Sequence, residues 1–466
     1  MKVVLYNPRA VFFTMPLALV AVGSALDRDR CDVHIVDGRL EPDPAGRAIA
    51  ETDGALCLGL SVLTGAPIRD ALAVARAVKA ARPNLPIVWG GWHPSLFPAE
   101  CLDEPAVDVV VIGQGEDTFR EVVERFAAGA GLAGCRGTAH RAGGRVIVEP
   151  PRPLADLDSY PAHDYGLVDV ERYFELKRRR QIDYMSSQGC RFRCGFCADP
   201  FVYGRGWTAL APARIAREID ALVARHGCDE VAFQDETFFT SPGRVDALCD
   251  ELIGRRLSVA WTATMRADQA CRLSDALLDK AVAAGLRRVM IGVESGSQRM
   301  LDWMKKDMTV EQVLAAAERC AARDVGAIFN FIVGFPDEPD ACLAETLALV
   351  KRLRAMHPAF ETPVFYYRPY PGSEIADLAR RRGYEFPRGL EAWADFDYVG
   401  GQSPWLTRAE QRRIERFAFY VRQAWSGGAW RWPLRAASRW RVARDVYAWP
   451  VEKRLVELVR PRQAVS

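Results

Sequence analysis

The chain lacks any apolar run of the roughly 18 residues that a membrane-spanning helix requires. It also lacks net charge, because 62 Lys and Arg residues stand against 60 Asp and Glu residues and leave only +2. That balance gives no global argument for a nucleic-acid partner. The twelve cysteines are scattered and do not form the disulfide framework of a small secreted domain. We therefore expect a soluble or at most peripheral protein.

The remaining composition is that of an ordinary globular chain. Hydrophobic residues make up 49% and charged residues 26%, so a sizeable core is possible and disorder is not indicated. A length of 466 residues suggests two or three domains. The N-terminal stretch Met1–Pro8 is typical of a short strand rather than a signal peptide.

Three closely spaced cysteines dominate the motif content. Cys190, Cys194 and Cys197 form a C-x3-C-x2-C run directly after the apolar segment 182–186. A [4Fe–4S] cluster normally takes four cysteines, so three would leave one iron open for a small chelating ligand. A structural zinc ion would want four ligands, and the nearest candidates, His226 and Cys228, lie about thirty residues on. Chance clustering of buried cysteines is the third interpretation.

With the aromatic Phe196 before its third cysteine, this run resembles the signature of radical S-adenosylmethionine (SAM) enzymes. The resemblance implies that SAM fills the open iron through its amino and carboxylate groups. An electron, from a flavodoxin or ferredoxin-type donor, would then cleave SAM to a 5′-deoxyadenosyl radical that removes a hydrogen atom from a small-molecule substrate. A low-valent cluster needs a reducing compartment, so we expect a cytoplasmic protein.

From residue 182 to about 390, strand-like and helix-like segments alternate. The six repeats are too few for a closed eight-stranded barrel, and the resemblance implies a partial (β/α)6 barrel with its site at the C-terminal ends of the strands. The predicted strands cover 182–186, 230–234, 260–265, 288–293, 328–333 and 364–367.

Polar groups follow these predicted strands where a site would form. The resemblance implies cofactor contacts for Asp235, Arg266, Glu294 and Ser295, with Glu294 contacting the ribose or amino-acid part of SAM. A helix cap or a surface ion pair is the simpler interpretation of any one of them. Of Tyr366 and its neighbour Tyr367, we expect one to line the site and guide substrate or donate a hydrogen atom, since successive strand residues face opposite sides. Tyr366 is the one we nominate as catalytic.

Residues 1–150 contain five short strands with helical crossovers, which predicts a doubly wound, Rossmann- or flavodoxin-like α/β domain. Ser61, Leu63 and Thr64 follow the third strand, and Gly90 and Gly91 follow the fourth. Adjacent glycines let a bulky ligand approach the backbone closely. A Gly143-Gly144 hairpin closes the domain, and residues 151–181 are predicted to be a linker.

These loops resemble the S-x-L and G-G elements of cobalamin-binding domains. The third element, D-x-H-x-x-G, is absent, and Asn7–Thr14 stands in its place. The resemblance therefore implies cobalamin bound without a lower histidine ligand; the alternative is a domain that binds no cobalamin and serves only as a lid. His93 is more simply a packing residue than a ligand.

The helical C-terminal region, 391–466, is rich in aromatic and basic residues. Five tryptophans and nine Lys or Arg residues lie after residue 424, against three acidic residues. This composition suits a membrane surface, although a helical cap over the barrel mouth or stacking on nucleic acid would also use it. The tryptophans are Trp425, Trp430, Trp432, Trp440 and Trp449.

The two halves together resemble the cobalamin-dependent radical SAM enzymes, which include C-methylases and the anaerobic magnesium-protoporphyrin monomethyl ester oxidative cyclase. Our first hypothesis is methylation of an unactivated carbon. The second is cyclisation or oxidation of a tetrapyrrole-like or lipid substrate without methyl transfer. The third is a non-catalytic iron–sulfur or cobalamin sensor, which would have no need to hold SAM.

Overall fold

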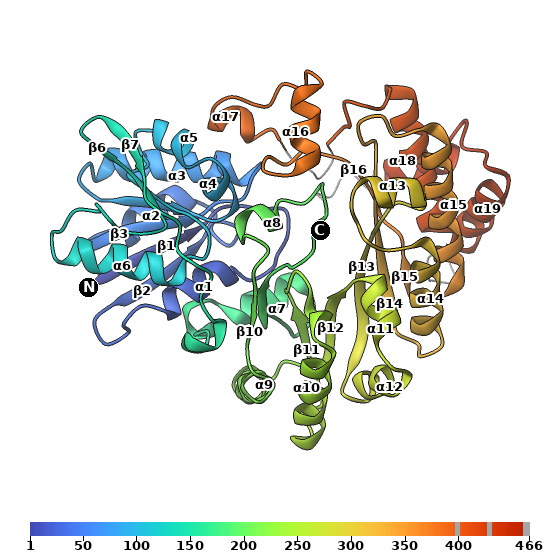
Figure 1. Cartoon of the computed structure of the whole chain (residues 1–466), viewed down its shortest axis with the longest axis horizontal. Coiled ribbons are helices and arrows are strands. Elements are labelled where there is room, and N and C mark those ends of the chain that lie inside the picture. Colours follow the sequence, from blue (N-terminus) through green and yellow to red (C-terminus); the bar gives the residue numbers. More distant parts are fainter. Residues whose placement is uncertain (397–400, 426–430, 460–466) are drawn as a thin grey trace.

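The computed structural model describes residues 1–396, 401–425 and 431–459. It contains an N-terminal α/β domain, a second α/β unit and a group of C-terminal helices at the far end (Figure 1). The predicted fold class is confirmed, and the two sheets have the parallel order that helical crossovers require.

The N-terminal sheet has seven strands in the order β2-β1-β3-β4-β5-β6-β7. The first five are parallel, and the β6–β7 hairpin adds an antiparallel edge through its Gly143-Gly144 turn. The strands are β1 (Lys2–Asn7), β2 (Asp32–Asp37), β3 (Ala55–Ser61), β4 (Ile87–Gly90), β5 (Val109–Val111), β6 (Thr138–Ala142) and β7 (Arg145–Val148).

Helices cover both faces of this sheet because alternate strand residues bury on opposite sides. Val4 and Tyr6 pack towards α2 and α3, whereas Val3 and Leu5 pack towards α1 and α6. The helices are α1 (Leu17–Ser24), α2 (Pro44–Glu51), α3 (Pro67–Ala81), α4 (Trp92–Leu96), α5 (Pro98–Asp103) and α6 (Glu116–Ala127).

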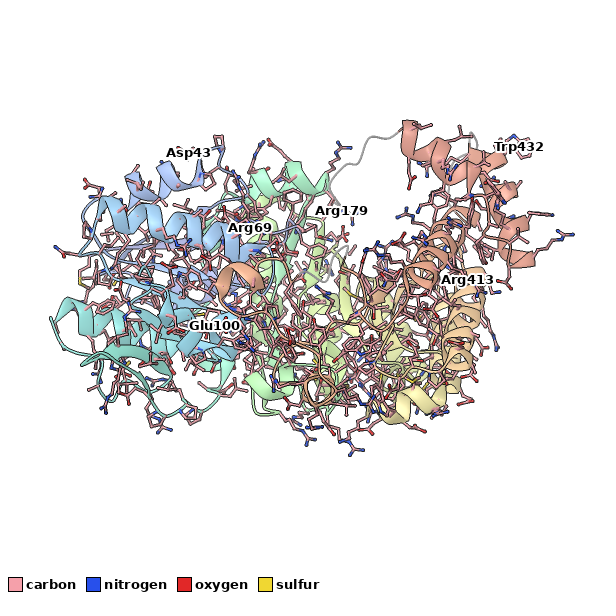
Figure 2. All side chains as sticks on the ribbon, turned by 90° about the horizontal axis from the view of Figure 1, so that it is seen from above. Asp43, Arg69, Glu100, Arg179, Arg413 and Trp432 are labelled. Carbon is pink, nitrogen blue, oxygen red and sulfur yellow. The ribbon has the colours of Figure 1, made fainter. Side chains whose placement is uncertain are left out.

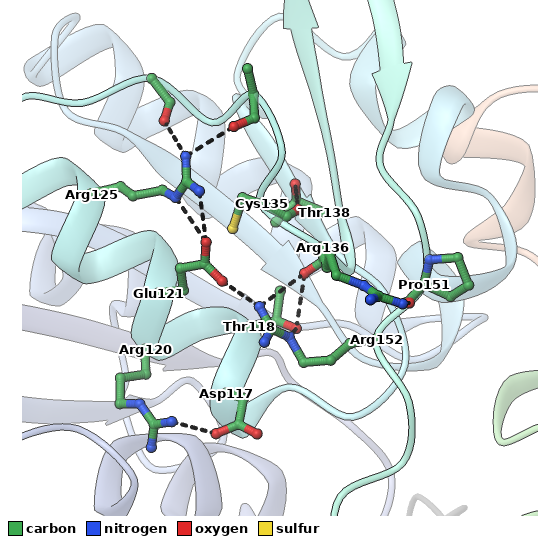
Figure 3. Close-up of polar contacts among 12 residues, drawn as sticks. Asp117, Thr118, Arg120, Glu121, Arg125, Cys135, Arg136, Thr138, Pro151 and Arg152 are labelled. Carbon is green, nitrogen blue, oxygen red and sulfur yellow. Dashed lines mark hydrogen bonds and ion pairs between the residues drawn. The ribbon is translucent and has the colours of Figure 1, made fainter.

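The predicted linker is folded onto both halves of the molecule. At its start, the guanidinium of Arg152 donates to Glu121 and Thr118 of α6 (Figure 3). Further on, α7 (Val170–Lys177) buries Tyr173 and Phe174 in the core of the second unit. Two short 3₁₀ turns, η1 (Leu157–Ser159) and η2 (Tyr165–Leu167), precede it.

The second unit is a seven-stranded parallel sheet in the order β8-β11-β12-β13-β14, with β15 and β16 both beside β14. This matches the predicted partial barrel. Its strands are β8 (Gln181–Tyr184), β11 (Glu230–Phe233), β12 (Ala260–Met265), β13 (Leu286–Glu294), β14 (Gly326–Val333), β15 (Phe360–Glu361) and β16 (Val364–Tyr366). Its helices are α9 (Pro212–His226), α10 (Pro242–Gly254), α11 (Ala267–Arg272), α12 (Asp275–Ala283), α13 (Gln298–Trp303), α14 (Val310–Ala321) and α15 (Asp340–Met356).

The chain returns to the N-terminal domain after the barrel. Helix α16 (Glu374–Arg381) leads to α17 (Leu390–Trp393), which lies over the first domain (Figures 1 and 2). Trp393 is buried against His93 and Phe97. Asp395 pairs with Arg69 at 2.5 Å. The segment 390–396, most of which the sequence analysis assigns to the C-terminal region, therefore packs on the N-terminal domain.

The last helices pack on the outside of the barrel beside α15 (Figure 1). They are α18 (Arg408–Ala424), α19 (Trp432–Arg444) and α20 (Val451–Val459). Lys351 of α15 holds Asp445 at the end of α19 at 2.9 Å. Trp430 lies outside the described residues. Among the residues that are described, no helix is long and apolar enough to cross a membrane.

Candidate active site between the two domains

The three predicted cluster ligands lie on one loop, which follows the short strand β9 (Ser187–Gly189) and precedes α8 (Asp199–Val202). All three cysteines are partly exposed. Gly195 at the loop centre donates its N–H to the carbonyl of Met304 and accepts from the N–H of Ile375, both at 2.8 Å. The loop is therefore fixed by backbone contacts to two distant segments.

Arg266, at the end of β12, touches a cluster cysteine. Its Nη1 lies 3.7 Å from Cys194 Sγ, and its guanidinium carbon lies 3.8 Å from the ring centre of Phe192. Nε donates to Asp268 at 2.8 Å, so the buried cation is held in one orientation. A fixed positive charge beside a sulfur favours the thiolate that metal binding requires. The position fits a contact to the cluster ligand.

No three His, Cys, Asp or Glu side chains within the described ranges converge as the ligands of one metal ion do. In a [4Fe–4S] cluster the cysteines bind different irons, so their sulfurs need not meet at one point. Burial raises the pKa of the Cys190 and Cys197 thiols. A bound cationic cluster would supply the charge that stabilises their thiolates.

The carboxylate of Asp235 is hydrogen-bonded to two serines, and the residue also lines a cavity inside the barrel, so its cofactor contact stays a prediction. Its carboxylate accepts from Ser186 N at 2.7 Å and from the hydroxyls of Ser186 and Ser187 at 2.6 Å. The side chain is fully buried, and burial raises its pKa. Asp235 thus orders the backbone that leads into the cysteine loop.

The neighbouring Glu236, which sequence reasoning missed, also faces a cavity. Its Oε2 accepts from Gly189 N at 3.2 Å, one residue before Cys190. Burial, followed by the nearby charge of Asp199, raises its pKa to about 8. The available signal was its place next to Asp235 at the same strand end.

Glu294 ends β13 in a left-handed conformation, φ +68°, that is uncommon for a residue other than glycine. Its Oε1 lies 2.6 Å from the Nζ of Lys306, and both side chains are buried. That ammonium lies 5.5 Å from the ring centre of Phe196 in the cysteine loop. A strained acidic residue and a buried cation therefore lie beside the cluster ligands, as at many functional sites.

The hydroxyl of Ser295 is hydrogen-bonded within the protein and is not left open to a ligand. Its hydroxyl lies 3.0 Å from the Oγ1 of Thr346 in α15 and accepts from Ser297 N at 3.1 Å. It is completely buried. The predicted cofactor contact of Ser295 therefore needs correction, because these bonds position the turn that carries Glu294.

The barrel lumen contains a cavity of about 600 Å³. Its wall includes Thr264, Met290 and Ile328, which are side by side on β12, β13 and β14. Met290 remains 43% exposed even though it is apolar. The lumen is also lined by charged residues, among them Glu230, Arg288 and Asp324, so its wall combines apolar, hydroxyl and charged groups.

Tyr366 is placed outside this lumen, which corrects the nominated catalytic residue. Register pairs Phe365 with Ile332, on the lumen side of β14, and Tyr366 with Val333, on the opposite side. The Tyr366 hydroxyl donates to the carbonyl of Gln411 in α18 at 3.0 Å. Tyr367 is buried and stacks on Phe335.

A second cavity, of about 270 Å³, lies at the carboxyl ends of the N-terminal strands. Of the predicted cofactor residues it is lined by Ser61, Leu63, Gly90 and Gly91. The barrel closes its other side with Met185, Gln188, Tyr203 and Glu236.

Glycine is required where the cavity wall bends. Gly91 has φ +96°, and a Cβ there would lie 2.9 Å from Val62 N. Further inside, a Cβ on Gly59 would lie 2.9 Å from Leu5. The lining is mainly apolar and close to the backbone, which fits a large neutral ligand held by shape.

Thr64 and His93 lie behind this wall. The Thr64 hydroxyl is 3.2 Å from His93 Nδ1, and burial lowers the pKa of His93 to about 4. The ring packs on Phe97 and Trp393, which fits the packing role. In place of the missing D-x-H-x-x-G element, Arg9 donates to Gly38 O at 2.9 Å. The lining residues include no histidine that could ligate cobalt.

Comparison with protein families gives one match in each half of the chain. Residues 184–350 match the radical SAM superfamily, and residues 5–123 match the B12 binding domain. A relative described as an uncharacterized methyltransferase of Pyrococcus horikoshii is 29% identical over 394 residues, which are 81% of this chain and 83% of that protein. An anaerobic magnesium-protoporphyrin IX monomethyl ester cyclase of Rubrivivax gelatinosus is 28% identical over 68% of this chain and 57% of its own length.

Solved structures share the arrangement of the domains. The radical SAM methyltransferase TsrM of Kitasatospora setae, with tryptophan and a SAM analogue bound, aligns with a TM-score of 0.74 over 90% of this chain and 88% of that one. The cobalamin-dependent radical enzyme OxsB, with aqua-cobalamin and SAM bound, gives 0.76 over 100% and 74%. Both are 17% identical to the chain, so they support the fold alone.

Proposed function

Because this chain is a radical SAM enzyme with an N-terminal B12-binding domain, we propose that it methylates an unactivated carbon with a methyl group supplied through cobalamin. One observation carries the proposal. The chain segment that carries the cysteines also lines the cavity of the first domain, since Gln188 lies two residues before Cys190 and Tyr203 six residues after Cys197. In this proposal, cofactors held by the cysteines and by the cavity act on one substrate.

In this proposal Cys190, Cys194 and Cys197 hold a [4Fe–4S] cluster, and Arg266 keeps the Cys194 sulfur oriented. Glu294 and Lys306 orient the ribose or amino-acid part of SAM from the end of β13. When bound, the cluster and SAM supply a 5′-deoxyadenosyl radical, and cobalamin supplies the methyl group.

The first domain holds cobalamin by shape rather than by a lower ligand. Ser61, Leu63, Gly90 and Gly91 form the cavity wall, and Thr64 supports it from behind through His93. A carbon radical reacts with a methyl donor whose bond breaks homolytically, which SAM itself does poorly, so a second cofactor is chemically sensible.

The substrate is proposed to be hydrophobic, either lipid-like or a tetrapyrrole. Support comes from the lumen, where Met290 exposes 43% of its surface although it is apolar. Exposed apolar side chains inside a cavity are favourable when a hydrophobic ligand covers them. Polar recognition can come from Thr262 and Thr264 on the neighbouring strand β12.

The electron is proposed to come from a flavodoxin or ferredoxin-type protein. Three arginines beside the cysteine loop, Arg191, Arg193 and Arg205, are exposed. Within the described part of the chain, Arg193 is the one of the three that forms an ion pair, with Asp307 at 2.7 Å. A positive surface beside the cluster ligands suits an acidic redox partner through electrostatic steering.

The alternative is oxidative cyclisation without methyl transfer, which the relationship to the cyclase favours. The products of SAM turnover separate the two reactions. Methyl transfer through cobalamin consumes one SAM as a methyl donor and one as a radical source, so it must give S-adenosylhomocysteine as well as 5′-deoxyadenosine. Cyclisation need give only 5′-deoxyadenosine.

The experiment uses the anaerobically reconstituted enzyme with a low-potential reductant and SAM. We expect both products from the wild type. Cys194→Ala should lose the iron and yield no 5′-deoxyadenosine, whereas Cys271→Ala, a partly exposed cysteine outside the loop, should match the wild type. Formation of 5′-deoxyadenosine alone would contradict methyl transfer, and formation of neither product would contradict the whole proposal.

A further inference from the structure

Helices α19 and α20 each have an inner face and an outer face. On α19, Ser438 and Val442 are buried, and the following Tyr447 packs edge-on against Phe417 of α18. The outer side carries Trp432 and Trp440, which are 63% and 50% exposed. Trp432 lies at the edge of the molecule, far from the N-terminal domain (Figure 2).

The exposed apolar surface continues through the turn into α20. Trp449 is 80% exposed and has φ +49°, a strained conformation for a bulky residue. Leu455 and Leu458 are 57% and 80% exposed. We call Trp432, Trp440, Trp449, Leu455 and Leu458 together the tryptophan face.

Hydrogen bonds and an ion pair hold this surface in place. The guanidinium of Arg441 donates to the carbonyls of Val446, Ala448 and Trp449 at 2.9–3.2 Å. It also pairs with Glu452 at 3.0 Å, which joins α19 to α20. The fold therefore holds Trp449 outward at a conformational cost, as is common where a side chain has a function.

Charge around the tryptophan face is positive. Residues 431–458 contain seven Lys or Arg residues and three acidic ones. Each acid has a basic partner within the protein: Asp445 pairs with Lys351, Glu452 with Arg441 and Glu457 with Lys453. Arg444 and Arg454 are exposed beside the tryptophans, and the guanidinium of Arg444 lies 5.2 Å from the Trp440 ring centre.

We propose that the tryptophan face binds the surface of an anionic lipid bilayer. Tryptophan is favoured at the level of the lipid headgroups, leucine at the acyl boundary and arginine next to anionic phosphates. Exposed leucines are of no use for stacking on nucleic acid, so the combination points to lipid. Attachment lies in the plane of the membrane, and it is independent of the proposed methyl transfer because the face is distant from the cysteine loop.

The test measures binding of the reconstituted enzyme to sedimented vesicles of phosphatidylcholine, with and without about 30% phosphatidylglycerol. We expect binding to be about tenfold stronger with the anionic lipid, together with a blue shift of tryptophan emission. The variant Trp432→Ser/Trp440→Ser/Trp449→Ser should bind at least about tenfold more weakly, and Arg444→Gln/Arg454→Gln should lose the preference for anionic lipid.

A control variant removes three exposed apolar side chains elsewhere. Val146, Ile147 and Val148 on β7 are 36%, 38% and 55% exposed, and their triple serine variant should bind vesicles like the wild type. Equal weak binding to both vesicles, or a tryptophan variant that binds like the wild type, would overturn the proposal. So would a dimer in solution that the tryptophan variant abolishes, because a second copy would then be the occupant. All variants should form 5′-deoxyadenosine normally without vesicles, so a failure here leaves the proposed reaction untouched.

Discussion

The cysteine loop and the glycine-lined cavity are connected by one chain segment, because Gln188 and Tyr203 on either side of the cysteines line the cavity. The two sites nevertheless consist of different kinds of residue. Around the loop, Arg266, Glu294 and Lys306 are buried charges held by hydrogen bonds. The cavity presents glycines and aliphatic side chains to its ligand instead. The contrast follows from the ligands, since a charged cluster with SAM needs ligation and counter-charges, whereas a large neutral macrocycle is recognised by shape.

The largest effect should come from adding a methyl group to Gly91 in the cavity wall. A methyl group there would approach Val62 N to 2.9 Å and force the wall to move, which costs about 1–3 kcal/mol or roughly 5- to 150-fold in affinity. We expect Gly91→Ala to retain little cobalt after gel filtration while its iron content stays that of the wild type. Cobalt and iron analysis of the purified protein measures both.

Gly54→Ala is the matched control for this change. Gly54 also has a left-handed conformation, φ +66°, but a Cβ there has nothing within 4 Å. Both variants place an alanine at a positive φ, but Gly91 also has ψ −167°, a region that is essentially restricted to glycine. The control therefore measures the effect of a positive φ without a collision. If Gly91→Ala keeps its cobalt, or if it loses iron in parallel, the two sites are not the separate structures described above.

The sequence predicted those parts of the site whose residues are close in the chain or lie at the ends of neighbouring strands. Cys190, Cys194 and Cys197 are close in the chain, and Ser61 and Gly91 follow strands whose ends must meet at one sheet edge. The βα alternation that defines those edges is itself a local signal. These features needed no knowledge of long-range packing.

The remainder depends on contacts that no local pattern encodes. Lys306 lies in a loop after α13 and reaches Glu294 only because the chain folds back. Tyr366 faces outward because of its register with β14, and a shift of one residue would have reversed it. Helix α17 packs on the N-terminal domain because Trp393 is buried in the core of that domain. Nothing in the local sequence of this short helix indicates that contact.

A smaller effect is expected at the charged site. Removing the ammonium in Lys306→Met leaves Glu294 buried and unpaired, so both SAM binding and stability should fall. The double variant Glu294→Gln/Lys306→Met removes the unpaired charge, and we expect it to recover its melting temperature while SAM binding remains about 10- to 100-fold weaker. Equilibrium binding of SAM to the reconstituted protein measures this.

Lys305→Met is the control, since Lys305 forms an exposed ion pair with Glu374, and such pairs contribute little. It should bind SAM like the wild type. A double variant with wild-type affinity would show that Glu294 and Lys306 only support the fold, and the contrast between the two sites would then rest on the cysteines and Arg266 alone.

The smallest effect concerns His93, which lies between the cavity wall and Trp393. Burial lowers its pKa to about 4, against about 6.5 in the unfolded chain. Between these values the unfolded state binds the extra proton, so stability is lost as pH falls from about 6.5 towards 4, by at most about 1.4 kcal/mol per pH unit. His93→Gln should therefore show a smaller drop in melting temperature from pH 7 to pH 5 than the wild type, and it should leave the absorption spectrum of bound cobalamin unchanged. His163, whose pKa burial also lowers to about 4, is not among the residues that line the Gly91 cavity, and His163→Gln should remove a comparable part of the pH dependence. A spectrum altered in His93→Gln alone would mean that the histidine acts on the cofactor, and the first domain would then bind its ligand by more than shape.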